Sequence, residues 1–127
     1  MRLHHFAFEV SDLTSAIRFY EDTFGMKVTF RDTDPAHGES FAILSFGTGA
    51  LELLQRLGAS RPLQRPETAP PYCPHLAFET EDLVDTVNDL TARGVPLVGG
   101  PFDSGKGIQW VYFADPDGNL IEFIQVS

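Results

Sequence analysis

An internal repeat with an offset of 70 residues constrains this chain more than any other feature of its sequence. HFAFEVSDL at residues 5–13 and HLAFETEDL at 75–83 are identical at six of nine positions. The same offset aligns ALELLQ at 50–55 with LIEFIQ at 120–125. A repeat kept over this much of the chain indicates a duplication, so both halves should fold in the same way.

Each half has the pattern of a βαβββ unit. In the first half, Ser11-Asp12 supplies a helix N-cap, and Gly25 follows the last apolar residue of the expected helix, where helices commonly end. Its apolar residues recur at helical spacing, at positions 13, 17, 20 and 24. In the second half Gly94 ends the helix, and Asp115-Pro116-Asp117-Gly118 forms a turn between two strands. We expect helices at about 13–24 and 82–93, and strands at about 5–10, 26–32, 40–47, 49–55, 75–80, 95–98, 107–114 and 119–126.

These units predict an α+β fold with two paired βαβββ modules that form a curved mixed sheet around a central cavity. Module 1 spans 1–55 and module 2 spans 73–127, and a linker at 56–72 contains four prolines. Neither module, at roughly 60 residues, is expected to be stable alone. We therefore expect one domain, 1–127, whose modules pack together within the chain or across a homodimer.

The composition excludes several classes of partner. Eighteen acidic and nine basic residues give a net charge of −9, which argues against binding nucleic acid or an anionic membrane. Cys73 is the only cysteine, so an internal disulfide is impossible. The N-terminal residues read as a strand and have no signal-peptide pattern, so we expect a cytoplasmic protein.

Potential metal ligands occupy equivalent positions in the two modules. A histidine starts the first strand of each module and a glutamate lies in the middle of its last strand: His5, Glu52, His75 and Glu122. Because side chains alternate along a strand, the histidine lies opposite the face that packs on the helix. Two imidazoles and two carboxylates that converge around a twofold axis would suit Zn, Ni, Co, Mn or Fe(II).

A structural interpretation of these residues must be weighed as well. A single histidine in a strand is more often a structural or exposed residue than a metal ligand. Glutamates inside apolar strands are less easily explained, since a charge is seldom buried without a partner. His4 aligns with Pro74 and not with a histidine, so His5 is the predicted ligand, and His37 is expected at the surface.

Three segments give the chain a recognisable resemblance. HFAFEVSDLTSAIRFYEDTFGMKV, HLAFETEDL and DPDGNLIEFIQ resemble the vicinal oxygen chelate superfamily, which includes glyoxalases, bleomycin resistance proteins and dioxygenases, and they are most similar to its glyoxalase I branch. The resemblance implies that the same four residues bind the metal. It also implies a lyase or isomerase that polarises vicinal oxygens of a small substrate, with Glu122 as general base and Glu52 as its symmetric counterpart.

The sequence departs from the glyoxalase I pattern at two positions. Glu9 stands where that branch has a basic residue that holds glutathione, and Arg56 replaces an asparagine. Both are candidate substrate-binding residues, and Glu9 with its repeat Glu79 would repel an anionic peptide. In the alternative interpretation, Glu9 and Glu79 lie at strand ends and are exposed to water.

Other members of the superfamily fit less well. Ring-cleaving dioxygenases need a further histidine in the strand GIQWVYFA, which has none, and methylmalonyl-CoA epimerases usually have a different turn at DPDGN. The competing function is a non-catalytic protein that binds or sequesters a small molecule such as an antibiotic.

Three further features have local interpretations. Trp110 is a candidate wall of the substrate pocket, although aromatic residues in such strands usually belong to the core. GPFDSGK at 100–106 has the spacing of a phosphate-binding loop, but Gly107 replaces the required Ser or Thr, so we expect a flexible loop or lid. Cys73 could approach the metal, but a buried thiol is the simpler expectation.

Overall fold

Two units of similar size make up the chain in the computed structural model, which describes residues 1–58, 63 and 72–127. They span Met1–Gln64 and Arg65–Ser127, and we describe each by itself. Most of the predicted linker at 56–72 lies outside the described residues, and Arg56 is the last residue of a strand.

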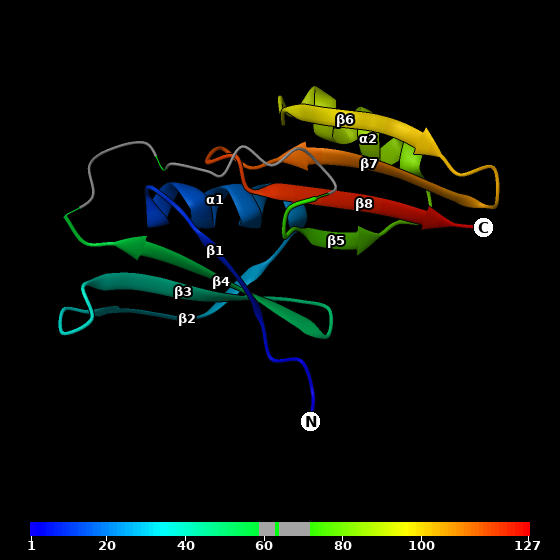
Figure 1. Cartoon of the computed structure of the whole chain (residues 1–127). Helices are drawn as coiled ribbons and strands as arrows, with labels where there is room; N and C mark the ends of the chain where they lie inside the picture. Colours follow the sequence, from blue (N-terminus) through cyan, green and yellow to red (C-terminus); the bar gives the residue numbers. More distant parts are fainter. Residues whose placement is uncertain (59–62, 64–71) are drawn as a thin grey trace. The chain divides into compact units, whose positions relative to one another are not determined.

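The two units have the same order of elements, as Figure 1 shows. Module 1 contains β1 (Phe6–Glu9), α1 (Leu13–Phe24), β2 (Lys27–Asp34), β3 (Glu39–Phe46) and β4 (Gly49–Arg56). Module 2 contains β5 (Leu76–Glu79), α2 (Leu83–Ala92), β6 (Leu97–Asp103), β7 (Ile108–Ala114) and β8 (Leu120–Val126). The predicted βαβββ pattern is therefore confirmed in both halves.

Each module folds into one four-stranded mixed sheet. The strand orders are β1-β4-β3-β2 and β5-β8-β7-β6. The first strand pairs parallel with the last strand of its module, and the remaining pairs are antiparallel. This parallel pairing sets Ala7 opposite Glu52 and Ala77 opposite Glu122, so both predicted glutamates lie in the centre of a sheet.

The helices begin and end where their capping residues predict. The Asp12 side chain accepts a hydrogen bond from the Ser15 backbone N–H at 2.9 Å, and Asp82 caps α2 in the same way. Gly25 ends α1 with φ 66°, a left-handed conformation that glycine adopts without a steric penalty. In the described residues, no helix is long and apolar enough to cross a membrane.

Alternation along the strands separates a helix-packed face from the glutamate face. Leu51 and Leu53 of β4 are 2% and 0% exposed, and Glu52 lies between them on the opposite face. In β8 the corresponding buried residues, Ile121 and Phe123, flank Glu122. The core of each module therefore lies between its helix and one side of its sheet, which leaves the other side for a site.

The prediction for residues 95–106 was wrong in part. The expected strand ends at 98, but β6 continues to Asp103, so the phosphate-loop-like segment supplies the end of a strand and a hairpin turn. Register shifts on both sides of Gly99 let the strand continue through its glycines. Gly100 has φ 93°, and a Cβ there would meet the Phe102 ring at 2.9 Å, so the close approach needs glycine.

Candidate active site

His75 and Glu122 form the tightest candidate ligand pair. His75 directly precedes β5, and its Nε2 lies 2.8 Å from Oε2 of Glu122 in the middle of β8. The side chains are 18% and 14% exposed, so both are largely withdrawn from water but remain reachable. The fold of module 2 therefore brings together two of the predicted ligands.

The other nitrogen of His75 is held by the backbone. Its Nδ1 lies 2.7 Å from the carbonyl oxygen of Cys73. A carbonyl can only accept, so Nδ1–H donates this bond, and the Nε2 edge of the ring is left facing the Glu122 carboxylate. Anchoring one ring nitrogen in this way is how proteins orient metal-binding histidines. Cys73 is half-buried and contributes its backbone to this contact.

The equivalent pair of module 1 is more open. Nε2 of His5 lies 3.9 Å from Oε1 of Glu52, and the side chains are 35% and 20% exposed. Nδ1 of His5 lies 2.7 Å from Nδ1 of the adjacent His4. The module 1 pair thus has residue types that bind metals, but the orientation of His5 depends on the exposed His4.

Each module carries one pair of potential metal ligands. Within the described ranges, no group of three or more His, Cys, Asp or Glu side chains is close enough to hold one ion. One imidazole nitrogen and one carboxylate oxygen at 2.8 Å nevertheless form a donor set that suits a divalent metal. Convergence of the two pairs on one ion stays a prediction.

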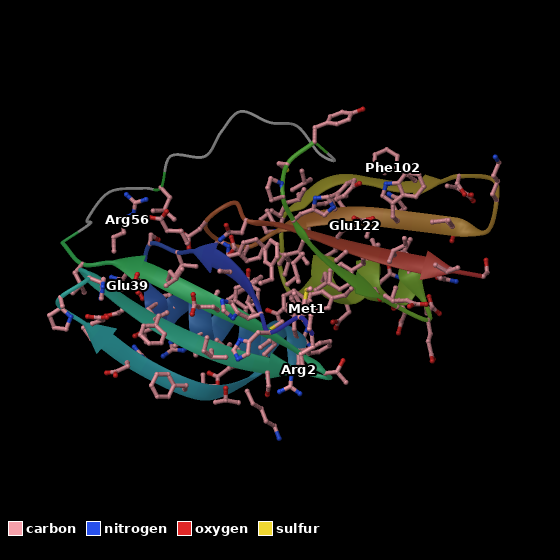
Figure 2. All side chains as sticks on the ribbon, turned by 60° about the horizontal axis from the view of Figure 1, so that its bottom comes forward. Met1, Arg2, Glu39, Arg56, Phe102 and Glu122 are labelled. Atoms are coloured by element: carbon pink, nitrogen blue, oxygen red, sulfur yellow. The ribbon has the colours of Figure 1, made fainter. Side chains whose placement is uncertain are left out.

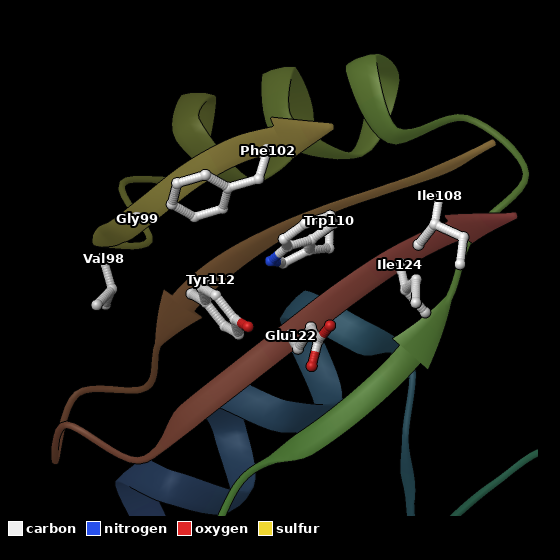
Figure 3. A pocket seen from close by; sticks show the side chains of 8 residues that line it. All are labelled: Val98, Gly99, Phe102, Ile108, Trp110, Tyr112, Glu122 and Ile124. Atoms are coloured by element: carbon white, nitrogen blue, oxygen red, sulfur yellow. The ribbon is translucent and has the colours of Figure 1, made fainter. Parts of the chain in front are cut away.

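A cavity of about 480 Å³ lies on the glutamate face of module 2. Figure 3 shows its walls, which come from β6, β7 and β8: Val98, Gly99, Phe102, Ile108, Trp110, Tyr112, Glu122 and Ile124. The strand register creates this surface, because Phe102, Trp110 and Ile124 form one cross-strand row, and Gly99, Tyr112 and Glu122 form the next. Trp110 therefore lines the cavity, and its role in substrate binding stays a prediction.

Tyr112 connects the cavity to the candidate ligand pair. It lies directly opposite Glu122 in the register, and its ring meets the His75 ring edge-on at a centroid distance of 5.7 Å. Burial raises the pKa of the Tyr112 hydroxyl, and the negative charge of Glu122 raises it further. The hydroxyl therefore stays protonated near neutral pH and presents a hydrogen-bond donor beside the carboxylate.

Glu9 and Arg56 contact each other. Nε of Arg56 lies 2.9 Å from Oε1 of Glu9, and Arg56, at the end of β4 (Figure 2), is 72% exposed. The pairing compensates the charge of Glu9, so this residue does not present the uncompensated negative charge that its sequence position predicts. Glu79, its repeat in module 2, is exposed and has Val126 at the position equivalent to Arg56.

Two paired glutamines, whose role was not predicted from the sequence, stabilise the framework of the site. Oε1 of Gln55 accepts a hydrogen bond from the Leu13 N–H at 2.7 Å, and Gln125 accepts one from the Leu83 N–H at the same distance. Each glutamine thereby joins the last strand of a module to the first turn of its helix. Both glutamines occupy the same position in the 70-residue repeat, and this feature of the sequence could have predicted their role.

Comparisons with known proteins agree with this architecture. The family model described as Glyoxalase/Bleomycin resistance protein/Dioxygenase superfamily matches residues 2–123. An ethylmalonyl-CoA/methylmalonyl-CoA epimerase of Cereibacter sphaeroides is 30% identical and covers 98% of both chains. A lactoylglutathione lyase of Haemophilus influenzae is 28% identical, over 98% of this chain and 93% of the relative.

Solved structures share the fold along nearly the whole chain. The trypanothione-dependent glyoxalase I of Leishmania major has a TM-score of 0.78 and 27% identity, over 98% of this chain and 86% of its own. TnmS3, an antibiotic-binding protein from Streptomyces sp. CB03234, has a TM-score of 0.73 and 26% identity, over 100% of this chain and 97% of its own. Relatives with this fold thus include lyases, isomerases and binding proteins, and glyoxalase I-like relatives are metal-dependent. The strand order, the duplicated His/Glu pairs and the family match together show that this chain belongs to the glyoxalase/bleomycin resistance protein/dioxygenase superfamily.

Proposed function

We propose that the protein is a metal-dependent lyase or isomerase that acts on a small substrate with vicinal oxygens. The observation that carries the proposal is the His75–Glu122 pair, with 2.8 Å between Nε2 and Oε2 and with Nδ1 anchored on the Cys73 carbonyl. The epimerase and lyase relatives support a reaction at a carbon next to a carbonyl group.

His75 and Glu122, together with His5 and Glu52, are the residues that would hold the metal. A bound divalent ion, whether Zn, Ni, Co, Mn or Fe, supplies Lewis-acid chemistry at a substrate oxygen. The burial of most of both side chains in module 2 limits competition from water and strengthens their interaction with charge.

Glu122 is the proposed general base. Its side chain is 14% exposed and lines the cavity, so a substrate in the cavity can bring a carbon-bound proton within its reach. The Tyr112 hydroxyl on the neighbouring strand can donate a hydrogen bond to a substrate oxygen at this end of the cavity. Glu52 is the corresponding base of module 1, in a pair that is wider by about 1 Å.

Metal analysis tests the first half of the proposal. Protein purified without chelator should carry up to one transition metal per chain, and metal-free protein should regain thermal stability with Zn, Ni, Co or Mn, because an ion that binds only the native state stabilises it. His75→Ala and Glu122→Gln should abolish this stabilisation. His37→Ala is the matched control, since His37 is 77% exposed and contacts Asp34. Metal-free protein with no affinity for any of the four ions would contradict the proposal.

Turnover assays test the second half. Metal-loaded protein is incubated with the hemithioacetal of methylglyoxal and glutathione, with other thiol adducts and with acyl thioesters, while product absorbance is followed. We expect turnover with at least one of these classes and its loss in Glu122→Gln. Because none of the described residues that line the cavity is basic, we expect weak or no activity with glutathione. Unchanged turnover in Glu122→Gln would exclude this residue as the base.

A non-catalytic binding protein is the second candidate. The apolar and aromatic walls of the cavity favour it, together with the likeness to an antibiotic-binding structure. A ligand that raises the melting temperature, with no turnover in any class above, would support this function over the first.

We also propose that the protein is a homodimer that binds small molecules. Each module presents one sheet face with only half of the candidate ligand set, and pairing of modules is the arrangement that would complete it. Pairing can occur within a chain or between two chains.

A further inference from the structure

We propose that the cavity of module 2 binds a planar aromatic group of the substrate, next to the oxygens that approach Glu122. This inference rests on the proposed function, since it names the substrate class for the same site. It assigns the aromatic specificity to Phe102 and Trp110, with Gly99 lying against the Phe102 ring.

Aromatic rings form most of one wall. The Phe102 and Trp110 rings lie 5.6 Å apart at 34°, and the Phe102 and Tyr112 rings lie 6.2 Å apart at 57°. Figure 3 shows these three side chains facing one space on the sheet. Flat aromatic surfaces bind another ring by stacking and by burial of apolar area, so this wall complements a planar ligand.

Gly99 lies against two of the aromatic rings that line the cavity. A Cβ built at this residue would have its nearest neighbours in the Phe102 ring at 3.6 Å and the Tyr112 ring at 3.9 Å. The missing side chain would therefore point between the two rings. Larger side chains at this position would push against these two rings and so change the shape of the aromatic wall.

Exposure of the wall identifies the surface that a ligand would cover. Phe102 remains 45% exposed, although it stacks on Trp110. The volume of about 480 Å³ falls within the range of small-molecule sites, roughly 300–1,000 Å³. A ring that stacked on Phe102 would remove this apolar surface from water.

The polar groups of the cavity lie at one end and carry no positive charge. Glu122 and the Tyr112 hydroxyl are adjacent across β7 and β8, whereas Phe102, Ile108 and Ile124 line the remainder. Among the residues that line the cavity, none is Lys, Arg or His. An anionic peptide such as glutathione would leave its carboxylates unpaired here, so a neutral aromatic group is favoured.

Two neutral hydroxyketones test the inference directly. 2-Hydroxyacetophenone and hydroxyacetone share vicinal oxygens and differ by phenyl against methyl. Trp110 is the only tryptophan of the chain, so its fluorescence reports on the cavity, and calorimetry measures the affinities independently. In metal-free protein we expect the phenyl compound to bind about tenfold more tightly or better, because it buries more apolar surface.

Substitutions in the cavity test where the phenyl group binds. Phe102→Ala should weaken the phenyl compound about fivefold or more and leave hydroxyacetone unchanged, because only the phenyl group stacks on this wall. Phe46→Ala is the matched control: Phe46 is 44% exposed, close to the exposure of Phe102, but lies on β3 of module 1. Gly99→Val should also weaken binding of the phenyl compound, since its methyl groups would crowd the Phe102 and Tyr112 rings without removing either ring.

The outcomes separate this inference from the proposed function. Equal affinities for the two ketones, or an unchanged phenyl affinity in Phe102→Ala, would overturn the aromatic subsite even if metal-dependent turnover is found. Conversely, a tenfold preference in metal-free protein supports the subsite even if no metal binds and no substrate turns over.

Discussion

Asp115 should be the residue whose removal most weakens the hairpin that carries Tyr112 and Glu122. Its carboxyl group, in a residue only 2% exposed, accepts hydrogen bonds from the Asp117 N–H at 2.9 Å, the Asn119 N–H at 2.8 Å and Nδ2 of Asn119 at 2.7 Å. Each such bond contributes on the order of 1 kcal/mol net, and a buried donor that loses its partner costs more. Asp115→Ala should therefore lower the free energy of unfolding by about 2–4 kcal/mol.

Urea denaturation measures this loss. Trp110 lies on β7, one strand of the hairpin, so its fluorescence follows the unfolding of module 2, and linear extrapolation gives the free energy. Asp103→Ala is the matched control, because Asp103 also caps a hairpin turn, with bonds from the Gly105 N–H and Gln109 Nε2, but is exposed. We expect a clearly smaller loss for this control. A loss below about 1 kcal/mol for Asp115→Ala, or equal losses for the two variants, would refute burial as the source of the effect.

Three further predictions concern the framework, a titration and the assembly. Gln125→Ala removes the hydrogen bond to the Leu83 N–H and should cost about 1–2 kcal/mol in the same urea assay; an unchanged midpoint would contradict a structural role. The pKa of His37 is raised above its ordinary value of 6.5, because Asp34 accepts its hydrogen bond and adds a negative charge. The pair therefore contributes stability below about pH 6.5 that is lost as the pH rises through the higher native pKa, and an NMR titration should show the pKa fall in Asp34→Asn. Light scattering at micromolar concentration should give twice the chain mass of 14.1 kDa, whereas a monomer would exclude the proposed homodimer.

The duplication made much of the fold predictable from sequence. Asp12 and Gly25 mark the ends of α1 because capping is local chemistry, governed by the residue itself and its near neighbours. The positions of Glu52 and Glu122 could be predicted because alternation along a strand places a charged residue opposite two buried ones. Agreement between two copies then excluded most accidental patterns.

Contacts that lack a counterpart in the other copy were not predictable. Arg56 pairs with Glu9 across 47 residues of sequence. Val126 occupies the equivalent position in module 2, so comparison of the two copies could not predict this pair. β6 was predicted too short because Gly99, Gly100 and Pro101 usually end a strand, whereas here register shifts accommodate them. The aromatic wall depends on that continuation, so Phe102 could not be assigned to the cavity from sequence.

The two modules differ in how firmly they hold their candidate metal-binding side chains in one orientation. In module 2 the Cys73 carbonyl fixes one nitrogen of His75, and Tyr112 packs edge-on against the ring, which leaves the histidine few orientations besides the one that faces Glu122. In module 1, the aliphatic side chain of Ile43 lies opposite Glu52 and cannot donate a hydrogen bond, and the ring of His5 packs against the exposed His4. Because a preoriented pair loses less conformational freedom when it binds an ion, module 2 should carry the substrate and the proton chemistry, with module 1 completing the donor set.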